Sequence, residues 1–593
     1  MEEIFNSHNE FHRYPLGAIT DRESIHFKIV LKRDLKCRAA RLIAIDDETQ
    51  QKHELSMFWC KDFGNGKEAW ECDFLPDKVG LFWYIFEIDT DFGTKRIAKS
   101  NFSSAKILDL NTDYLSWQIT VYDKKFTTPD WLSGGIIYQI FPDRFFYSGE
   151  KKENVPSDRV LKRRWGEDFL KEKSEDINNC YYGGDLKGIE MKLSYLKSLG
   201  VTCIYLNPIF EAHSNHRYNT ANYLKIDPTL GTKSDFKRLC EKAKKLGIKI
   251  ILDGVFSHTG SDSVYFNKNN RYKTLGAYNS KDSEYFSWYK FLNWPNEYVS
   301  WWNFDTLPEV NEENDNFSDF ITGKGGVLSK WLDCGASGWR LDVADELPDD
   351  FIEKIRATIK RKKKKALLLG EVWEDASNKE SYGKRRKYLL GSELDSVMNY
   401  PFREAIIDFI RTKNSQGIFN TVLNICENYP SLVLNNLMNL LSTHDTERIF
   451  TVVSNITNTT KEECLNFIKL AVALQYTLPG VPSIFYGDEA GLTGGKDPFC
   501  RKCYPWGREN KDLLEFFKQI GNFRKQCVCL KSGRFTPIFI DDKTFAFKRE
   551  SKEGKIFCSF GFNDNKNILK FISEEEKITL TNSFKGKYFS LFY

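Results

Sequence analysis

The sequence lacks the features that would direct the protein to a membrane, a secretory route or nucleic acid. No apolar run is long enough to span a bilayer, and the start, M-E-E-I-F-N-S-H, has neither the basic nor the apolar region of a secretory signal. The 86 basic and 82 acidic residues leave a net charge of only +4, which argues against a surface for nucleic acid. We therefore expect a cytoplasmic protein without membrane or nucleic-acid partners.

A disulfide framework is also missing. The 14 cysteines are scattered, and several, such as Cys203, Cys334 and Cys558, stand in apolar segments, which favours reduced and buried thiols. Cys500 and Cys503 form a C-x-x-C pair, but no second pair or histidine cluster accompanies it, so we do not expect a zinc site there.

The chain is too long for one hydrophobic core, and its periodicity changes twice. Residues 1–122 alternate short β-rich runs with turns, which predicts an N-terminal β-sandwich whose last strand or linker is 117–123. Residues 123–513 alternate strands with helices. Eight such strands predict an α/β fold, a (β/α)₈ TIM barrel, with a loop subdomain inserted after strand 3 at about 259–320. Residues 514–593 predict a small C-terminal β-sandwich.

Four short motifs each end an apolar run with ionisable groups. They read I-I-L-D-G-V-F-S-H (250–258), G-W-R-L-D (338–342), L-L-L-G-E-V-W (367–373) and L-L-S-T-H-D (440–445). Each predicts a buried strand whose last residues emerge at the same end of a barrel. Together they supply Asp342, Glu371, Asp445, Arg340, His258 and His444. A single acid at a strand end is more often a helix cap or part of a loop ion pair. Several carboxylates converging at one end are what glycosidic bond cleavage needs.

These motifs resemble the α-amylase family, glycoside hydrolase family 13, and within it the neopullulanase, cyclomaltodextrinase and maltogenic amylase group. Further matching segments are I-Y-Q-I-F-P-D-R-F (137–145), G-G-D-L-K-G-I (183–189), H-R-Y-N-T-A-N-Y (216–223), T-H-D-T-E-R (443–448) and D-P-F-C-R (497–501). The resemblance covers nearly the whole chain, including the N-terminal sandwich.

The resemblance implies a role for each site residue. Asp342 would be the nucleophile, Glu371 the general acid/base, and Asp445 a group that binds sugar hydroxyls and stabilises the transition state. The implied substrate-binding residues are Tyr218, Asp253, His258, Arg340, Trp373, His444, Asp497 and Arg501. From the residues alone, Arg340 stands two positions before Asp342, so both side chains point to one face of a strand. We expect the guanidinium to lower the pKa of Asp342.

The sequence departs from its relatives where many of them bind calcium. Ser257 precedes His258 where those relatives have a calcium-binding Asn, and residues 145–153 are rich in Lys and poor in hard oxygen ligands. Asp185 remains, but without its partners. We therefore expect no metal and no other cofactor, with calcium left open as the alternative.

The resemblance implies a retaining α-glucan hydrolase that cleaves α-1,4-glucosidic bonds of maltooligosaccharides, cyclodextrins or pullulan, with α-1,6 cleavage and transglycosylation left open. V-A-D-E-L follows Asp342 in place of the Lys-His of true α-amylases, which favours short or mixed-linkage substrates. One alternative is a predominantly α-1,6 debranching (pullulanase-like) or glycosyl-transferring enzyme. Another is a non-catalytic sugar-binding barrel, which the presence of all three acids disfavours. A homodimer through the N-terminal domain, as in relatives, is also left open.

Overall fold

The structure, a computed structural model, describes residues 3–100, 104–162, 164–166, 177–456, 459–563, 573 and 583–592. By its contacts the chain divides into two units. The first comprises Met1–Thr127, Asp375–Glu393 and Phe419–Leu434, and the second comprises Thr128–Glu374, Leu394–Ile418 and Asn435–Tyr593. The division into three consecutive domains at residues 122/123 and 513/514 stays a prediction.

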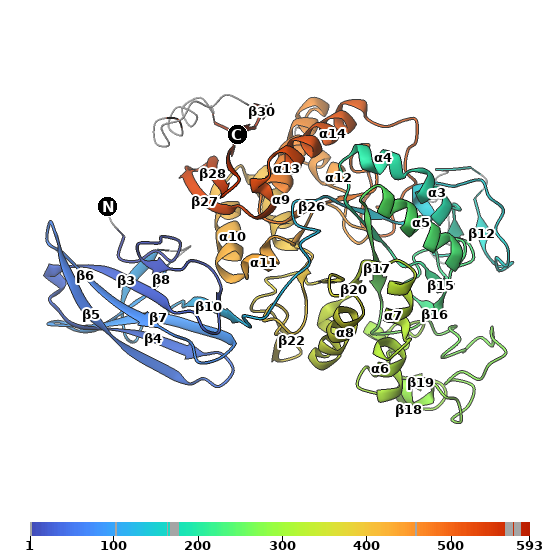
Figure 1. Cartoon of the computed structure of the whole chain (residues 1–593), viewed down its shortest axis with the longest axis horizontal. Helices are drawn as coiled ribbons and strands as arrows, with labels where there is room; N and C mark the ends of the chain where they lie inside the picture. Colours follow the sequence, from blue (N-terminus) through green and yellow to red (C-terminus); the bar gives the residue numbers. More distant parts are fainter. Residues whose placement is uncertain are drawn as a thin grey trace. The chain divides into compact units, whose positions relative to one another are not determined.

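Antiparallel strands form most of the first unit, drawn in blue in Figure 1. β10 (Trp117–Tyr122) pairs with β7 (Gly80–Thr90), so the segment 117–123 belongs to the sheet. The long β5 (Lys52–Gly64) pairs first with β4 and then with β6, and thereby joins two groups of strands. The other strands are β1 (Arg13–Tyr14), β2 (Ile19–Thr20), β3 (Ile25–Lys32), β4 (Cys37–Asp46), β6 (Lys67–Phe74), β8 (Gly93–Lys99) and β9 (Ala105–Asp109). The 3₁₀ turn η1 (Arg33–Leu35) joins β3 to β4.

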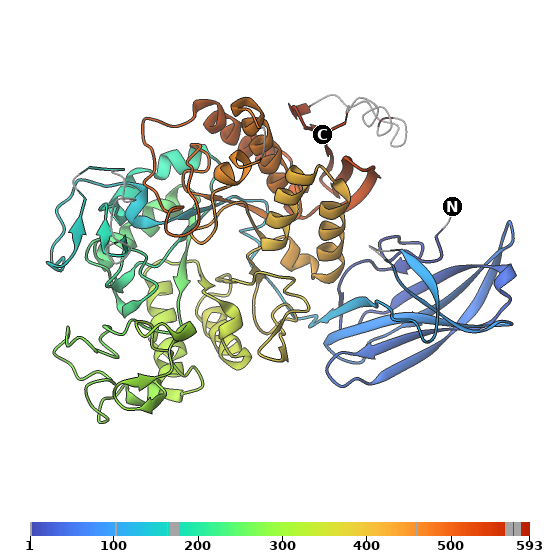
Figure 2. The same cartoon turned by 180° about the vertical axis from the view of Figure 1, so that it is seen from behind.

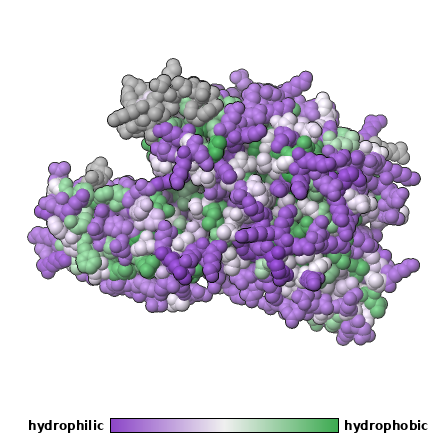
Figure 3. Space-filling view, in the orientation of Figure 1, coloured by the Kyte–Doolittle hydropathy of each residue, from purple (hydrophilic) through white to green (hydrophobic). Residues whose placement is uncertain are grey.

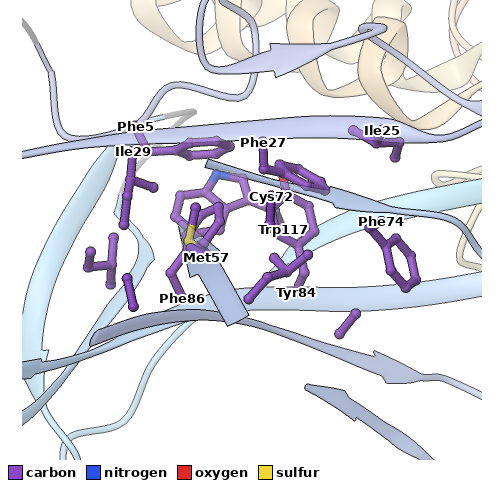
Figure 4. Packing of buried hydrophobic residues seen from close by; sticks show 14 of the residues in the cluster. Phe5, Ile25, Phe27, Ile29, Met57, Cys72, Phe74, Tyr84, Phe86 and Trp117 are labelled. Atoms are coloured by element: carbon purple, nitrogen blue, oxygen red, sulfur yellow. The ribbon is translucent and has the colours of Figure 1, made fainter. Parts of the chain in front are cut away.

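Aromatic side chains between these strands form the core of the first unit (Figure 4). Trp117 stacks on Tyr84 with ring centroids 5.4 Å apart, and Phe5 meets the Trp117 ring edge-on at 4.9 Å. Phe27 and Phe86 complete the cluster, and all five side chains are fully buried. Burial of each large apolar side chain stabilises the fold by about 1.5–3 kcal/mol. These contacts confirm the predicted N-terminal β domain.

Two later segments of the chain belong to the same unit. Ser377 accepts a hydrogen bond from Gln118 Nε2 at 3.0 Å, and Glu427 pairs with the buried Arg13 at 2.7 Å. Their regular elements are β22 (Glu380–Ser381), β23 (Lys384–Arg385), α11 (Ser431–Leu434) and the C-terminal part of α10 (Ser415–Asn428). Polar contacts that are far apart in sequence therefore fix these segments to the β domain.

Eight parallel strands form the centre of the second unit. They are β11 (Ile137–Ile140), β14 (Cys203–Leu206), β17 (Lys249–Gly254), β20 (Gly338–Leu341), β21 (Leu367–Gly370), β24 (Ser396–Val397), β25 (Met438–Leu440) and β26 (Val481–Phe485). A parallel bridge between Met398 and Met438 joins the two ends of the strand order, which closes the sheet into a barrel. Buried side chains such as Ile251, Leu369 and Leu440 fill its interior. The predicted (β/α)₈ barrel is thus confirmed.

Helices cover the outside of this barrel, as the two opposite views in Figures 1 and 2 show. They are α3 (Leu186–Met191), α4 (Leu193–Ser198), α5 (Lys233–Lys245), α6 (Asp315–Thr322), α7 (Val327–Asp333), α8 (Asp349–Lys362), α9 (Tyr400–Thr412), α12 (Ile449–Ser454), α13 (Lys461–Thr477), α14 (Lys511–Gln526) and α15 (Cys529–Ser532). Local sequence fixes their ends. At the start of α5, for example, Thr232 and Asp235 form a reciprocal capping box.

The chain between β17 and α6 contains few regular elements. They are η2 (Phe286–Trp288), β18 (Phe291–Asn293), β19 (Glu297–Tyr298) and η3 (Trp301–Asn303). This is the predicted insertion after strand 3. Shorter elements elsewhere in the unit are α1 (Pro142–Phe145), β12 (Val160–Leu161), β13 (Cys180–Tyr181), β15 (Phe210–Ala212), β16 (Thr220–Ile226) and η4 (Ala344–Glu346).

An antiparallel sheet follows α14 and α15, which confirms a C-terminal β domain. Its described strands are β27 (Arg534–Ile540), β28 (Thr544–Ser551), β29 (Gly554–Gly561), β30 (Ser583–Gly586) and β31 (Phe589–Phe592). The face of the molecule in Figure 3 is largely hydrophilic, with scattered apolar patches. Within the ranges that the structure describes, no helix combines the length and apolarity needed to cross a bilayer.

Candidate active site

Three carboxylates surround one buried guanidinium at the ends of adjacent barrel strands. Arg340, in β20, lies 2.7 Å from Asp342 and 2.8 Å from Asp253 through the same nitrogen, Nη1. Its Nη2 lies 2.8 Å from Glu371 Oε2, just beyond β21. The register explains this convergence, because Asp253 pairs with Arg340 across the sheet. All four side chains are at most 8 % exposed.

The expectation of a lowered pKa for Asp342 is wrong. Burial raises the pKa of the Asp342 carboxyl well above its ordinary value, and Arg340 opposes this rise without cancelling it. The negative charges of Glu371 and Asp253 act in the same direction as burial. The charge of Arg340 therefore does not offset the burial of Asp342 among neighbouring carboxylates.

Glu371 is oriented by two donors on separate segments. The backbone N–H of Val343 donates to Glu371 Oε2 at 2.8 Å, and Trp373 Nε1 donates to Oε1 at 3.2 Å. The Trp373 ring stacks on Tyr400, at the start of α9, with centroids 4.0 Å apart. Trp373 is 46 % exposed, so one face of the ring remains accessible beside the carboxyl group.

Asp445 follows β25 and binds two neighbours. His444 Nε2 lies 3.0 Å from Asp445 Oδ2, and Arg501 Nη2 lies 3.3 Å from Oδ1. Arg501 also pairs with Asp497 at 2.9 Å, and its Nε donates to the backbone oxygen of His444 at 2.9 Å. Burial raises the pKa of Asp445 to about 7, against the opposing charge of Arg501.

His444 is held as a neutral ring in one tautomer. The Gln139 amide lies 3.0 Å from Nδ1, which leaves Nε2 to carry the proton and donate toward Asp445. Burial lowers the pKa of His444 well below its ordinary value, and the nearby Arg501 adds to this effect. The ring also stacks on Tyr218, with centroids 5.1 Å apart and planes at 5°.

Tyrosines link the carboxylate cluster to this second group. Asp253 Oδ2 accepts from Tyr205 at 2.6 Å and from Tyr218 at 2.8 Å. The Tyr218 hydroxyl also hydrogen-bonds His444 and accepts from Asn207 Nδ2 at 2.9 Å. Both carboxylate oxygens of Asp253 therefore accept hydrogen bonds, which hold this side chain in one orientation.

His258 lies on another side of the site, just beyond β17. Its Nδ1 is 3.1 Å from Ser257 Oγ, and its ring faces Trp301 at 5.3 Å. Burial lowers the pKa of His258 to about 4, against a hydrogen bond with the Tyr218 backbone that raises it. The ring is therefore neutral near pH 7.

The eleven residues singled out in the sequence thus lie in one connected network. Sequence reasoning missed four members of it, namely Gln139, Tyr205, Asn207 and Tyr400. A polar residue that interrupts an apolar strand, as in I-I-Y-Q-I-F and V-T-C-I-Y-L, is the signal that points to Gln139 and Tyr205. No comparable signal marks Tyr400, which depends on how α9 packs against Trp373.

Asp185, the remnant of a calcium site in the sequence comparison, pairs with a cation of the chain itself. Lys152 Nζ lies 2.8 Å from Asp185 Oδ2, and Ser148 Oγ donates to the same oxygen at 2.5 Å. The Gly188 N–H donates to Oδ1 at 2.5 Å. The described ranges contain no group of three or more His, Cys, Asp or Glu side chains suited to a metal ion. These donors suit a carboxylate that a lysine neutralises.

Comparison with known proteins places this geometry in context. Residues 139–533 match the alpha-amylase catalytic domain. The chain is 37% identical over 610 residues to an amylopullulanase of Thermoanaerobacter thermohydrosulfuricus, which covers 93% of this chain but only 40% of that protein. It is 36% identical to a cyclomaltodextrinase of Thermoanaerobacter pseudethanolicus, covering 76% of this chain and 74% of that one. The chain therefore spans less than half of this amylopullulanase.

A solved structure resembles the chain over most of its length. The type III pullulan hydrolase from Thermococcus kodakarensis aligns with a TM-score of 0.65 and 26% identity, covering 94% of each chain. The likeness extends beyond the barrel, because the aligned share is larger than the matched catalytic domain.

Proposed function

We propose that this chain, which belongs to the α-amylase family, is a retaining hydrolase of α-1,4-glucosidic bonds in maltooligosaccharides, cyclodextrins or pullulan. The observation that carries the proposal is the pair of ion contacts from Arg340 to Asp342 and Glu371, at 2.7 and 2.8 Å. They hold a nucleophile and an acid/base at the ends of neighbouring strands, as a double displacement requires.

In the first step, Asp342 attacks the anomeric carbon while the glycosidic C–O bond breaks. Glu371 transfers its proton to the departing sugar oxygen, and a glycosyl ester forms on Asp342. The Val343 N–H and Trp373 Nε1 hold the Glu371 carboxyl group in position for this transfer. Arg340 stabilises Asp342 in the ionised form that attacks.

In the second step, Glu371 takes a proton from water, whose oxygen bonds to the anomeric carbon as the ester to Asp342 breaks. Asp445, fixed between His444 and Arg501, would bind sugar hydroxyls and favour the positive charge that develops on the sugar. The neutral His444 and His258 rings offer hydrogen bonds to hydroxyls without adding charge.

A predominantly α-1,6-cleaving or glycosyl-transferring enzyme is the second candidate. Relatives named amylopullulanase favour it, as does the resemblance to a pullulan hydrolase. Product chromatography on maltotriose, β-cyclodextrin and pullulan in parallel separates the two. Panose from pullulan supports α-1,4 cleavage, whereas maltotriose supports α-1,6 cleavage. The absence of any sugar product from all three substrates would contradict both and favour a non-catalytic sugar-binding barrel.

We also propose that the protein needs no metal. The supporting observation is that Lys152 supplies the positive charge at Asp185. A cytoplasmic location is proposed as well, because every one of the 14 cysteines is free and eleven are buried.

A homodimer through the N-terminal domain is proposed on the exposed aromatics of β5. Phe58 is 71% and Trp59 50% exposed, which is unusual for such side chains. Sedimentation equilibrium of the wild type and of Phe58→Ser tests this. A monomeric wild type would contradict it.

A further inference from the structure

Arg217 stands between His216 and Tyr218, in the turn that precedes β16. Its φ is 63°, in the left-handed region that residues with a side chain rarely adopt and that glycine adopts without strain. The side chain is also fully buried, and a buried guanidinium is tolerated only when it is paired. An arginine at this position therefore costs free energy in two ways, which its contacts must offset.

Three oxygens lie around the guanidinium group. Nη1 donates to Asn215 O at 2.7 Å, and Nη2 donates to Thr229 Oγ1 at 2.6 Å and lies 3.5 Å from Asp227 Oδ1. Asp227 is fully buried, and it accepts hydrogen bonds from the backbone N–H of Thr229 at 3.0 Å and of Ala212 at 3.2 Å. The Arg217 side chain thus fixes its own turn to the segment that follows β16.

The left-handed residue turns the chain so that the rings on either side of it lie together. The His216 and Tyr218 rings are stacked, with centroids 6.1 Å apart and planes at 24°. The Tyr218 N–H donates to His216 Nδ1 at 3.1 Å, and the Arg217 N–H donates to Ser214 Oγ at 3.1 Å. Burial, together with the charges of Arg501 and Arg217, lowers the pKa of His216 to about 3, so Nδ1 can accept near pH 7.

Tyr218 connects this turn to the carboxylate cluster. Its hydroxyl donates to Asp253 Oδ2 at 2.8 Å and hydrogen-bonds His444, whose ring stacks on Tyr218 at 5.1 Å. Asp253 Oδ1 in turn accepts from Arg340 at 2.8 Å, and Arg340 contacts Asp342. A series of direct contacts therefore runs from the residue beside Arg217 to the proposed nucleophile.

We infer that Arg217 is a positioning residue: its guanidinium contacts hold residue 217 in the left-handed conformation and thereby set the Tyr218 ring against His444 and Asp253. The inference rests on the proposed function. Arg217 acts through Tyr218, which is among the proposed substrate-binding residues, and does not itself contact the substrate. Displacement of Tyr218 should slow bond cleavage more than it weakens binding of the other sugar units.

The first test removes the guanidinium and leaves the backbone conformation accessible. In Arg217→Gly, kcat on maltotriose should fall about tenfold, while KM changes less than about threefold. Arg217→Lys keeps the charge and should recover part of kcat. Thr229→Val removes one acceptor of the guanidinium without changing residue 217, and it should lower kcat by about threefold.

Arg159 offers a matched control. Its side chain is 2% exposed, and its Nη2 lies 3.8 Å from Asp227 Oδ2, so it is an equally buried arginine beside the same carboxylate. Arg159→Met should lower the Tm, as Arg217→Gly should, but kcat should stay within about twofold of the wild type. An equal fall of kcat in both variants would reduce Arg217 to a structural role and overturn the inference.

A double-mutant cycle tests whether the effect passes through Tyr218. In the Tyr218→Ala background no ring remains to be positioned, so the further change Arg217→Gly should lower kcat by less than about twofold. A further tenfold loss in this background would show that Arg217 acts by another route, which would also overturn the inference.

Crystal structures of the wild type and of Arg217→Gly supply a readout that does not depend on activity. The variant should show the Tyr218 hydroxyl beyond hydrogen-bond distance of Asp253. A Tyr218 ring in its wild-type place would contradict the positioning role. A wild type that releases no sugar from maltotriose, β-cyclodextrin or pullulan would instead contradict the proposed function, and the two structures would still decide whether Arg217 positions Tyr218.

Discussion

The Arg340 guanidinium lies 2.7 Å from the carboxylate of Asp342, which stands two residues further along the chain, just beyond β20. This spacing lets one cation stabilise the attacking form of the proposed nucleophile, although burial raises the pKa of the Asp342 carboxyl. Nη2 of Arg340 lies 2.8 Å from Glu371 Oε2, so the same cation contacts both the proposed nucleophile and the proposed acid/base.

Replacement of the proposed nucleophile should abolish turnover while the fold persists. In Asp342→Asn the side chain keeps its size and its place beside Arg340 but cannot form the ester, so kcat should fall by roughly 10³–10⁵-fold. Initial rates on maltotriose measure the loss, and circular dichroism and maltotriose binding should match the wild type. Asp350→Asn, an exposed acid at the start of α8, serves as the control and should retain full activity. Activity within tenfold of the wild type would assign the nucleophile elsewhere.

Chelation should leave the enzyme active. Incubation with EDTA should not change the rate or the Tm, because Lys152 supplies the charge that balances Asp185. In Lys152→Met the fully buried carboxylate loses its partner, an effect of about 3–5 kcal/mol for buried pairs, so the Tm should fall by several degrees. Lys151→Met changes the exposed neighbour and should leave the Tm unaltered. Inactivation by EDTA that calcium reverses would contradict the lysine's role.

Asp445 should lower the stability of the fold at high pH. Its pKa rises from 3.8 to about 7 on folding, so the folded state binds the proton more tightly than the unfolded state. The contribution of this group to stability therefore falls as the pH rises from about 4 to 7, and the whole penalty is present above 7. The ceiling is roughly 4 kcal/mol at about 1.36 kcal/mol per pKa unit, and the effect should be well below it because the side chain is 32% exposed.

Asp445→Asn removes this penalty together with the proposed function. The Tm difference between the variant and the wild type should therefore be positive at pH 8 and smaller at pH 5, as measured by calorimetry. Asp282→Asn changes an exposed acid and should show no such pH dependence. A variant that is less stable than the wild type at pH 8 would mean that the contacts with His444 and Arg501 outweigh burial.

The strands could be predicted from the sequence better than the contacts between side chains. Apolar runs such as L-L-L-G, which ends at Gly370, are buried on both faces, so their composition alone indicates a barrel strand. Asp342 and Glu371 could be located because each ends such a run. The pKa of Asp342 could not be predicted, since it depends on how many carboxylates surround Arg340, and Asp253 reaches it from a strand almost 90 residues earlier.

The side-chain contacts of the insertion after β17 could not be predicted from the sequence either. Its tryptophans are visible in the sequence, but the aromatic-rich stretch around them has no periodicity from which a contact could be inferred. In the structure the Trp301 N–H donates to Leu307 O, the Trp301 ring faces His258, and Trp302 is largely exposed.

The proposed acid/base role of Glu371 can be tested by separating the two chemical steps. Glu371→Gln cannot protonate a departing sugar oxygen, so cleavage of maltooligosaccharides should nearly stop. An aryl glycoside with a good leaving group needs little protonation, so it should still form the ester on Asp342. The ester should then accumulate, because water has lost its base, and intact-protein mass spectrometry should show the glycosyl adduct.

External azide should rescue the second step, because azide attacks the anomeric carbon without needing to lose a proton. The product should be an α-glycosyl azide, since two successive inversions retain the configuration. Glu374→Gln, three residues further along and exposed, is the matched control and should show neither adduct nor azide product above the wild-type level. If Glu371→Gln gave no adduct, no azide rescue and equal impairment on activated and natural substrates, the proton transfer would have to be assigned to another residue. Asp445, whose pKa lies near 7, would then be the first to test.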